Sequence, residues 1–254
     1  MTTWLIASDT GNWNKKMAHR NLRRNMEQVM KTFEKLIIVV SLFSGTVCMA
    51  QDDLKVDRYN TILATSPATI TLLPPDTSGG MPLMKCFKER KSTRSFDSKI
   101  LPDQVLSNLL WAAFGVNRSD GRRTAPSAMN RQEIQIYAAM QHGLYLYDAP
   151  SHSLRLVASE DIRNRTGKQD FVTDAPLDIV YVADLSKSGQ SSDEQIFYPA
   201  ADCGFIAENV YLYCASEGLA CVVRAMIDKL ALSKSMKLGP DQRILLSQTV
   251  GYAK

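Results

Sequence analysis

With 254 residues, 45% of them hydrophobic and 22% charged, the chain can build one sizeable globular domain and an appendage but hardly two full domains. The formal net charge of +4 arises within residues 1–50, and residues 51–254 carry equal numbers of basic and acidic side chains. The body of the chain therefore has no global charge excess that would attract it to nucleic acid or to an anionic membrane.

Residues 30–50 have the form of a secretory signal peptide. A short basic start precedes an apolar stretch of 15 residues, Leu36–Ala50, whose small residues near its end favour cleavage before Gln51. A retained membrane anchor is the alternative, but the stretch is shorter than the ~20 residues that span a bilayer. Lipid attachment at Cys48 is a minor alternative. We expect an exported, periplasmic protein without a stable membrane anchor after cleavage, and we interpret residues 1–29 as a misassigned upstream stretch.

Residues 51–80 form the next segment. The stretch up to Pro82 contains four prolines and no helix-length apolar run, which is typical of an extended and loosely held chain. We therefore expect an extended lead-in over residues 51–80, followed by one domain over residues 81–254.

The domain holds four cysteines and two histidines. The cysteines lie in apolar runs without Cys-x-x-Cys spacing, so we expect buried, unpaired thiols. The histidines have no ligand-spaced partner, so a zinc site or a Ser-His-Asp hydrolase is poorly supported. These residues are Cys86, Cys203, Cys214, Cys221, His142 and His152.

The first half of the domain mixes a helix with strands. Apolar residues at helical spacing predict a helix that starts after Pro102 and stops at Gly115. Alternation on either side of a His-Gly turn predicts a β-hairpin over 134–147, and a further strand is expected at 154–156. Residues 161–166 are expected to form a short helix or turn.

The second half begins with a buried strand, Leu177–Ala183. The longest helix is predicted over Asp193–Glu217, and its apolar residues cover more than one face, which indicates a helix that is central or lies in a subunit interface. Then follow a strand at 219–223, a helix at 228–238 and a strand at 243–250. Without regular βαβ alternation, this order predicts an α+β fold, a mixed sheet flanked by helices.

A basic segment follows the lead-in, with Arg90, Lys91, Ser92 and Arg94 in close succession. Cations interleaved with hydroxyls supply charge-assisted hydrogen bonds to a phosphate or polyhydroxyl group. If the chain runs extended here, Arg90, Ser92 and Arg94 point to one side. The alternative is a solvated basic helix end, since cations complement the C-terminal helix dipole.

A second segment, Arg122–Gln132, combines a rigid proline with small and hydrogen-bonding residues. Pro126 favours a fixed turn, and Ser127 and Asn130 can bond a flat ligand that approaches closely.

Together the two segments resemble the flavin-dependent nitroreductase family, with an Arg-x-Ser-x-Arg motif followed by a Pro-Ser-x-x-Asn-x-Gln turn. The resemblance covers roughly residues 81–254 and is closest to the branch that contains the azoline (thiazoline and oxazoline) dehydrogenases. Further matching stretches are Leu110–Arg118, Gly143–Asp148, Gly167–Phe171, Glu217–Arg224 and Gln248–Tyr252.

The resemblance implies a homodimer that holds FMN at the subunit interface. The first segment would bind the phosphate, the ribityl chain and the pyrimidine edge, the second would line the ring, and the backbone at a strand end would approach flavin N5. In the same order, these residues are Arg90, Lys91, Ser92 and Arg94; Pro126, Ser127 and Asn130; and Arg224 and Ala225.

The function expected from the resemblance is an exported FMN-dependent oxidoreductase that transfers two electrons by a ping-pong route. Its partners would be a small-molecule electron donor, with NAD(P)H common in the family, and a small-molecule acceptor. No catalytic side chain or metal is assigned, because the flavin carries the chemistry. One alternative is a flavin-binding protein without efficient turnover, suggested by Ala225, where many relatives have Gly, and by the end at Lys254. An anchored structural protein is the other.

Overall fold

A computed structural model of the chain describes residues 67–189 and 191–254. The expected signal peptide at 30–50, the upstream stretch at 1–29 and most of the lead-in lie outside the described residues.

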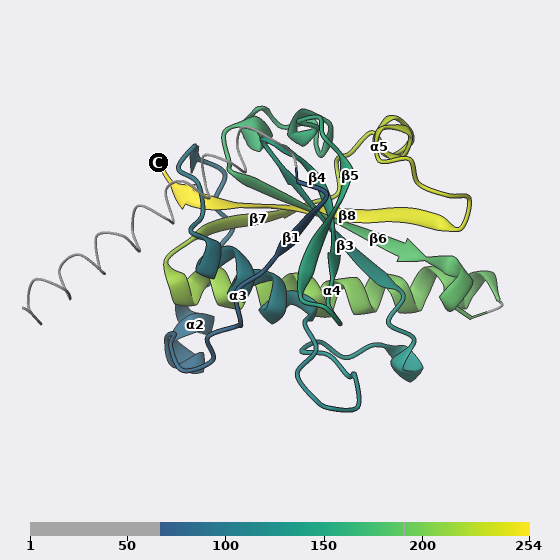
Figure 1. Cartoon of the computed structure of the whole chain (residues 1–254), viewed down its shortest axis with the longest axis horizontal. Helices are drawn as coiled ribbons and strands as arrows, with labels where there is room; N and C mark the ends of the chain where they lie inside the picture. The colour runs from purple at the N-terminus through teal and green to yellow at the C-terminus, as the bar shows by residue number, and fades with distance from the viewer. Residues whose placement is uncertain (1–66, 190) are drawn as a thin grey trace, which may run out of the picture. The chain divides into compact units, whose positions relative to one another are not determined.

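An eight-stranded sheet forms the centre of the domain (Figure 1). The strand order is β1-β5-β4-β3-β6-β8-β2, and β7 also pairs with β8. All the pairings between described strands are antiparallel, so no parallel pair occurs in the sheet that was expected to be mixed. The strands are β1 (Thr69–Thr71), β2 (Phe96–Asp97), β3 (Ile134–Met140), β4 (Gly143–Asp148), β5 (Ser153–Ala158), β6 (Leu177–Asp184), β7 (Ala220–Arg224) and β8 (Gln242–Ala253).

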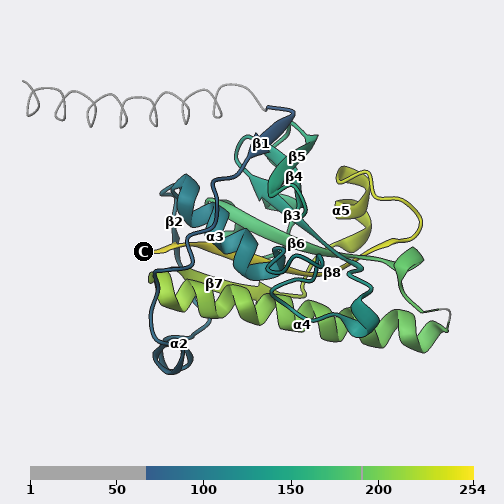
Figure 2. The same ribbon diagram turned by 60° about the horizontal axis from the view of Figure 1, so that its bottom comes forward.

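Helices cover both faces of this sheet. Figure 2 shows the long helix α4 along one face and α5 on the opposite side. Among the described residues, no helix has the length and apolar character needed to cross a membrane. The helices are α2 (Leu83–Glu89), α3 (Asp103–Phe114), α4 (Ser192–Glu217) and α5 (Lys229–Ser235), with short 3-10 turns η1 (Ala128–Asn130), η2 (Arg163–Arg165), η3 (Asp170–Thr173) and η4 (Leu185–Lys187). The predicted α+β class is confirmed.

The central strands are buried on both faces, which explains their continuous apolar sequence. In β6, Ile179 and Tyr181 face the core shared with α3 and α4, whereas Val180 and Val182 face the core shared with α5. Successive side chains of a strand point to opposite faces, so one strand contributes to both cores.

Local signals set the limits of α4. Ser191 caps its start, since the Ser191 hydroxyl accepts the Glu194 N–H while the Glu194 carboxylate accepts the Ser191 N–H. Gly218 ends the helix with φ +68°, a left-handed conformation that glycine adopts readily. The predicted helix over 193–217 is confirmed within one residue.

The described end of the lead-in is held more firmly than its proline content suggested. Strand β1 pairs with β5, so the sheet begins before Met81. Two residues after β1, the carbonyl oxygen of Leu73 accepts a hydrogen bond from the buried Ser107 hydroxyl of α3. The same oxygen lies 3.0 Å from Nε2 of His152. Backbone pairing and two side-chain contacts thus tie this stretch to the domain.

Two element ends differ from the prediction by three residues. Helix α5 ends at Ser235 rather than at residue 238, because Lys237 takes φ +54° and breaks the helical path. Strand β8 continues to Ala253, because β2 pairs with its last residues. The four cysteines of the domain are buried and unpaired, as predicted.

Candidate functional site

The basic segment leaves helix α2 and continues as extended chain. Arg90 follows the helix with φ −55° and ψ 122°, which is not helical. The Thr93 N–H then donates to the carbonyl oxygen of Cys221 at 2.9 Å, so the segment lies beside β7. The segment therefore runs extended, which was the condition for Arg90, Ser92 and Arg94 to point to one side.

Tyr211 of α4 fixes this segment. Its hydroxyl lies 2.8 Å from the Ser92 hydroxyl and accepts the Val223 N–H at 2.9 Å. The Arg90 guanidinium lies over the Tyr211 ring, 5.2 Å from its centroid, within cation–π range. Arg90 and Ser92 thus face the same side chain, as alternation along an extended chain predicts.

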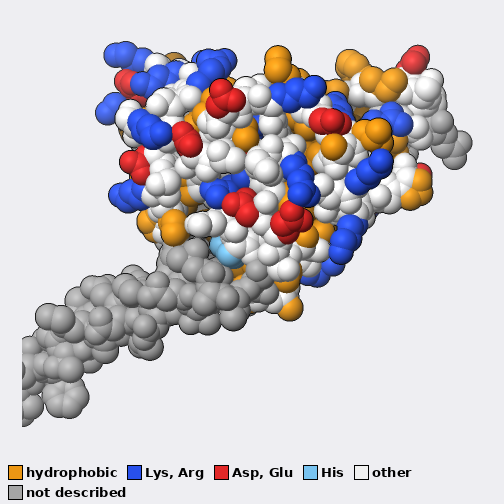
Figure 3. All heavy atoms as spheres, turned by 90° about the horizontal axis from the view of Figure 1, so that it is seen from above, with side chains coloured by type: hydrophobic (Ala, Val, Ile, Leu, Met, Phe, Trp, Pro, Cys, Tyr) orange, Lys and Arg blue, Asp and Glu red, His pale blue; other side chains and the backbone are white. Residues whose placement is uncertain are grey.

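Lys91 and Thr93 line a cavity of about 390 Å³ next to Tyr211. Lys85 and Glu89 of α2 contribute to its lining as well. Arg94 is exposed to solvent. On the face seen in Figure 3, basic and acidic side chains are interspersed, so this face carries no continuous positive surface.

Gln132 organises the second segment. Its backbone N–H donates to the Ser127 hydroxyl at 3.0 Å, and its side-chain amide donates to the Asn130 amide oxygen at 3.0 Å. Its side-chain oxygen accepts from Arg123 at 2.8 Å. Pro126 and Asn130 are exposed. The predicted turn is therefore a defined structure with an outward surface.

The two segments contact different parts of helix α4. Ser92 meets the helix at Tyr211, whereas the Ala128 N–H donates to Oδ2 of Asp202, nine residues earlier. Nine residues correspond to about 14 Å along a helix. The structure brings the basic segment to β7 but leaves the turn farther along the helix.

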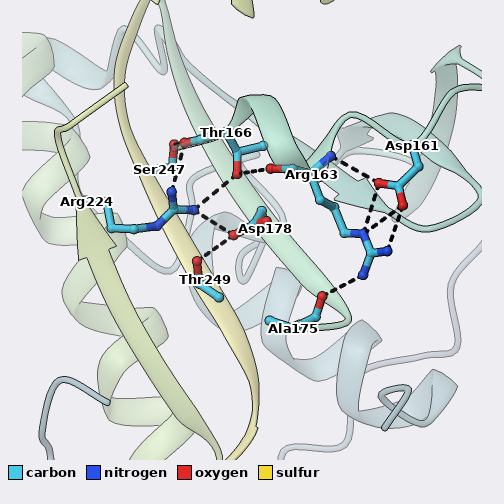
Figure 4. A network of polar contacts seen from close by, with 8 residues as sticks. All are labelled: Asp161, Arg163, Thr166, Ala175, Asp178, Arg224, Ser247 and Thr249. Atoms are coloured by element: carbon cyan, nitrogen blue, oxygen red, sulfur yellow. Dashed lines mark hydrogen bonds and ion pairs between the residues drawn. The ribbon is translucent and has the colours of Figure 1, made fainter. Parts of the chain in front are cut away.

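The Arg224 side chain belongs to a buried polar network (Figure 4). One guanidinium nitrogen donates to Asp178 Oδ1 at 2.6 Å, and the other donates to the carbonyl oxygen of Thr166 at 3.0 Å. The Thr249 hydroxyl donates to the same Asp178 oxygen, and Ser247 donates to Thr166. Arg224 is 4% exposed and Asp178 is fully buried.

Burial raises the pKa of Asp178 to about 6, although Arg224, Thr249 and Thr166 favour its ionised form. The carboxyl group is therefore mainly ionised at neutral pH, and its charge is balanced by Arg224. Gly167 leaves the room that this arrangement needs, because a Cβ atom there would lie 1.7 Å from an Arg224 nitrogen. The Arg224 side chain thus has a structural role.

Ala225 and Met226 follow this network at the end of β7 and are both exposed. The Met226 carbonyl accepts the Lys168 N–H at 3.0 Å. Lys168 and Gly167 line a groove of about 480 Å³. A ligand at the end of β7 can therefore contact the backbone and the small Ala225 side chain, but not the buried Arg224 side chain.

Three further polar residues were not predicted. Tyr211 lay in an apolar run that indicated packing alone. Asp202 and Glu133 are 3% and 1% exposed. Two sequence signals could have marked these carboxylates. Asp202 interrupts the buried apolar stripe of α4, and Glu133 directly follows the Pro-Ser-x-x-Asn-x-Gln turn.

The sequence profile of the Nitroreductase family matches residues 87–252, which is more than half of the chain. The chain belongs to the Nitroreductase family. The matched region begins in α2 and contains the basic segment, the turn and the end of β7.

Individual relatives agree with this assignment. A protein of Methanocaldococcus jannaschii that carries the name nitroreductase is 30% identical over 145 residues, 53% of this chain and 73% of that protein. A crystal structure from Ralstonia eutropha, also named as a nitroreductase, is 48% identical with a TM-score of 0.72, over 75% of this chain and 91% of that one.

The fold also occurs in the Escherichia coli microcin synthetase complex. A chain of that complex is 19% identical, has a TM-score of 0.58, and is matched over 73% of this chain and 78% of its own length. At this identity the likeness shows the fold alone. The family assignment makes the chain an oxidoreductase of the nitroreductase type.

Replacing Arg224 tests the structural role of its side chain. Arg224→Met is expected to lower the free energy of unfolding by about 3–5 kcal/mol, because it leaves a buried carboxylate without its cation. The double variant Arg224→Met with Asp178→Leu removes both charges and is expected to recover much of that loss. Urea unfolding measures both, and a single variant as stable as the unaltered protein would contradict the assignment.

Proposed function

We propose that the chain is an FMN-dependent oxidoreductase that transfers two electrons by a ping-pong route between a small-molecule donor and a small-molecule acceptor. The observation that carries the proposal is the basic segment held extended by Tyr211 beside β7, the strand that Ala225 follows. Both parts lie within the region that matches the family.

The first segment suits the phosphate and ribityl parts of the cofactor. Arg90, Lys91 and Arg94 supply cations, and Arg90 and Ser92 are oriented by Tyr211 before any ligand binds. Charge-assisted hydrogen bonds from such groups to a phosphate are roughly twice as strong as neutral ones. Orienting them in advance reduces the entropy lost on binding.

The spacing along β7 suits the ring. Thr93 meets the strand at Cys221, and Ala225 follows four residues later, which is about 13 Å along a strand. In this proposal the backbone at Arg224 and the exposed Ala225 approaches flavin N5, and Pro126, Ser127 and Asn130 line the ring. The Arg224–Asp178 pair keeps this strand end in place.

When bound, FMN would supply the redox chemistry by accepting a hydride and passing it on. The chain would bind the phosphate, orient the ring and present N–H groups to its reactive edge. NAD(P)H is one possible donor. The signal-peptide pattern at residues 30–50 supports a site of action outside the cytoplasm, in the periplasm. The resemblance to azoline dehydrogenases favours a heterocyclic acceptor or donor.

Substitution of the basic segment tests the proposed cofactor site. Arg94→Ala is expected to weaken FMN binding about 10- to 100-fold, because one hydrogen bond to a charged group contributes about 1.5–3 kcal/mol. The matched control is Arg243→Ala, which removes an exposed arginine of β8 outside both segments. Quenching of FMN fluorescence measures the affinity, and equal effects of the two variants would contradict the assignment.

We also propose that two copies of the chain form a homodimer through the outer faces of α2 and α4. Helix α4 buries one side against the sheet but leaves Ile196, Phe197 and Phe205 at least half exposed. Leu83 and Met84 of α2 are exposed too. Large exposed apolar side chains along two helices that pack against each other are typical of an interface.

A charge placed on this surface tests the dimer. Phe197→Glu is expected to convert a dimer into a monomer at micromolar concentration, because the carboxylate would have to be desolvated in the interface. Ser98→Glu, at an exposed loop position, serves as the control. Light scattering gives the mass of each, and a monomeric unaltered protein would exclude the proposed dimer.

A further inference from the structure

The turn at 126–132 has a backbone that must be held by its surroundings. Met129, Asn130 and Gln132 have φ values of +52°, +55° and +49°. Left-handed conformations cost side-chain-bearing residues of order 1 kcal/mol each. Met129 is 68% exposed, so its own side chain contributes little packing. The turn therefore depends on hydrogen bonds to fixed neighbours.

Asp202 provides one of these bonds from outside the turn. Its Oδ2 accepts the Ala128 N–H at 2.8 Å, immediately before the left-handed residues. Asp202 is 3% exposed and belongs to α4, so it connects the turn to the most extended helix of the domain.

A second buried carboxyl group, that of Glu133, adjoins Asp202. Glu133 is 1% exposed, and neither carboxyl oxygen has a hydrogen-bond donor while the group is ionised. Burial and the contact with Asp202 raise the pKa of Glu133 to about 7. Two adjacent buried carboxylates repel each other, but a protonated one can donate to its neighbour.

Arg131, Glu194 and Asp184 are other charged residues near the pair. Arg131 of the turn lowers the pKa of Glu133 and lies 3.8 Å from the Glu194 carboxylate of α4. Asp184, at the end of β6, donates its N–H to the Glu133 carbonyl, while its carboxylate accepts from Ser186. Arg131 thus acts as a cation on Glu133 and also forms an ion pair with Glu194.

From this arrangement we propose that Glu133 and Asp202 share one proton and that the shared proton holds the 126–132 turn in its ligand-binding shape. Protonated Glu133 donates to Asp202, which remains a carboxylate and accepts the Ala128 N–H. Loss of the proton places two negative charges side by side and loosens this contact. That this shape binds a ligand rests on the proposed function, in which Pro126, Ser127 and Asn130 line the flavin ring.

The Ala128 amide proton reports the state of the pair directly. In the full chain with isotope-labelled alanine, its NMR resonance is expected to shift between about pH 5.5 and about pH 8.5, with a midpoint near 7. Glu133→Gln should abolish the shift, since glutamine donates to Asp202 at every pH. The control Asp193→Asn, an exposed carboxylate on the same helix, should titrate like the unaltered protein.

FMN affinity supplies the second readout. It should fall about fivefold over this pH range in the unaltered protein, the equivalent of one net hydrogen bond. Glu133→Gln should bind equally well at each pH, and Glu133→Ala should bind weakly throughout although it retains its circular dichroism spectrum. Rescue by the glutamine but not the alanine variant distinguishes the shared proton from simple packing.

The outcomes separate the two claims. An Ala128 resonance that does not titrate, or one that titrates unchanged in Glu133→Gln, overturns the shared proton. Titration as expected, together with no FMN binding by any variant, supports the shared proton and contradicts the proposed function.

Discussion

The buried ion pair between Arg224 and Asp178 joins three strands of the sheet. Asp178 lies on β6 and Arg224 on β7, and Thr249 of β8 bonds the same carboxylate from between them. Two charges removed from water must satisfy each other and nearby hydrogen-bonding groups, because either one alone would be strongly destabilising. This requirement fixes the end of β7 and with it the direction in which Ala225 and Met226 leave the sheet. It also explains Gly167, where any side chain would displace the guanidinium.

Helix α4 gives the candidate site its second constraint. Tyr211 near its end anchors the basic segment and β7, and Asp202 near its middle anchors the turn at 126–132. The two anchors differ in kind. The first is a tyrosine hydroxyl, whereas the second belongs to the carboxyl pair of Glu133 and Asp202. In this account, the shared proton of the carboxyl pair adjusts the ring end of the site.

Much of the fold could be predicted from the sequence because its signals are local. Alternation in the strands, Pro102 before α3, and Gly218 after α4 each act within a few residues. Strand β1 was missed because three residues at a sheet edge carry little pattern, and their pairing with β5 is a long-range contact. The end of α5 was misplaced because the left-handed Lys237 has no sequence signature.

The candidate site was predicted only in part for a related reason. The positions of Arg90, Ser92 and Pro126 follow from motif order, but what orients them comes from α4, more than 70 residues away in sequence. Asp202 is a polar residue within an apolar stripe, and its purpose becomes apparent only when Ala128 lies against it. The Arg224 side chain could equally have bound a phosphate or closed an internal network. The position of Asp178 on β6, where it accepts a hydrogen bond from Arg224, shows that the side chain closes an internal network.

The visible absorption spectrum of the purified full chain, recorded before and after release of any ligand by heat, tests the central claim most directly. The account predicts flavin absorption bands in the protein and FMN in the released fraction, with the bands restored when FMN is added back. A colourless protein that takes up no added FMN would leave the fold and the family unchanged and would contradict the proposed chemistry.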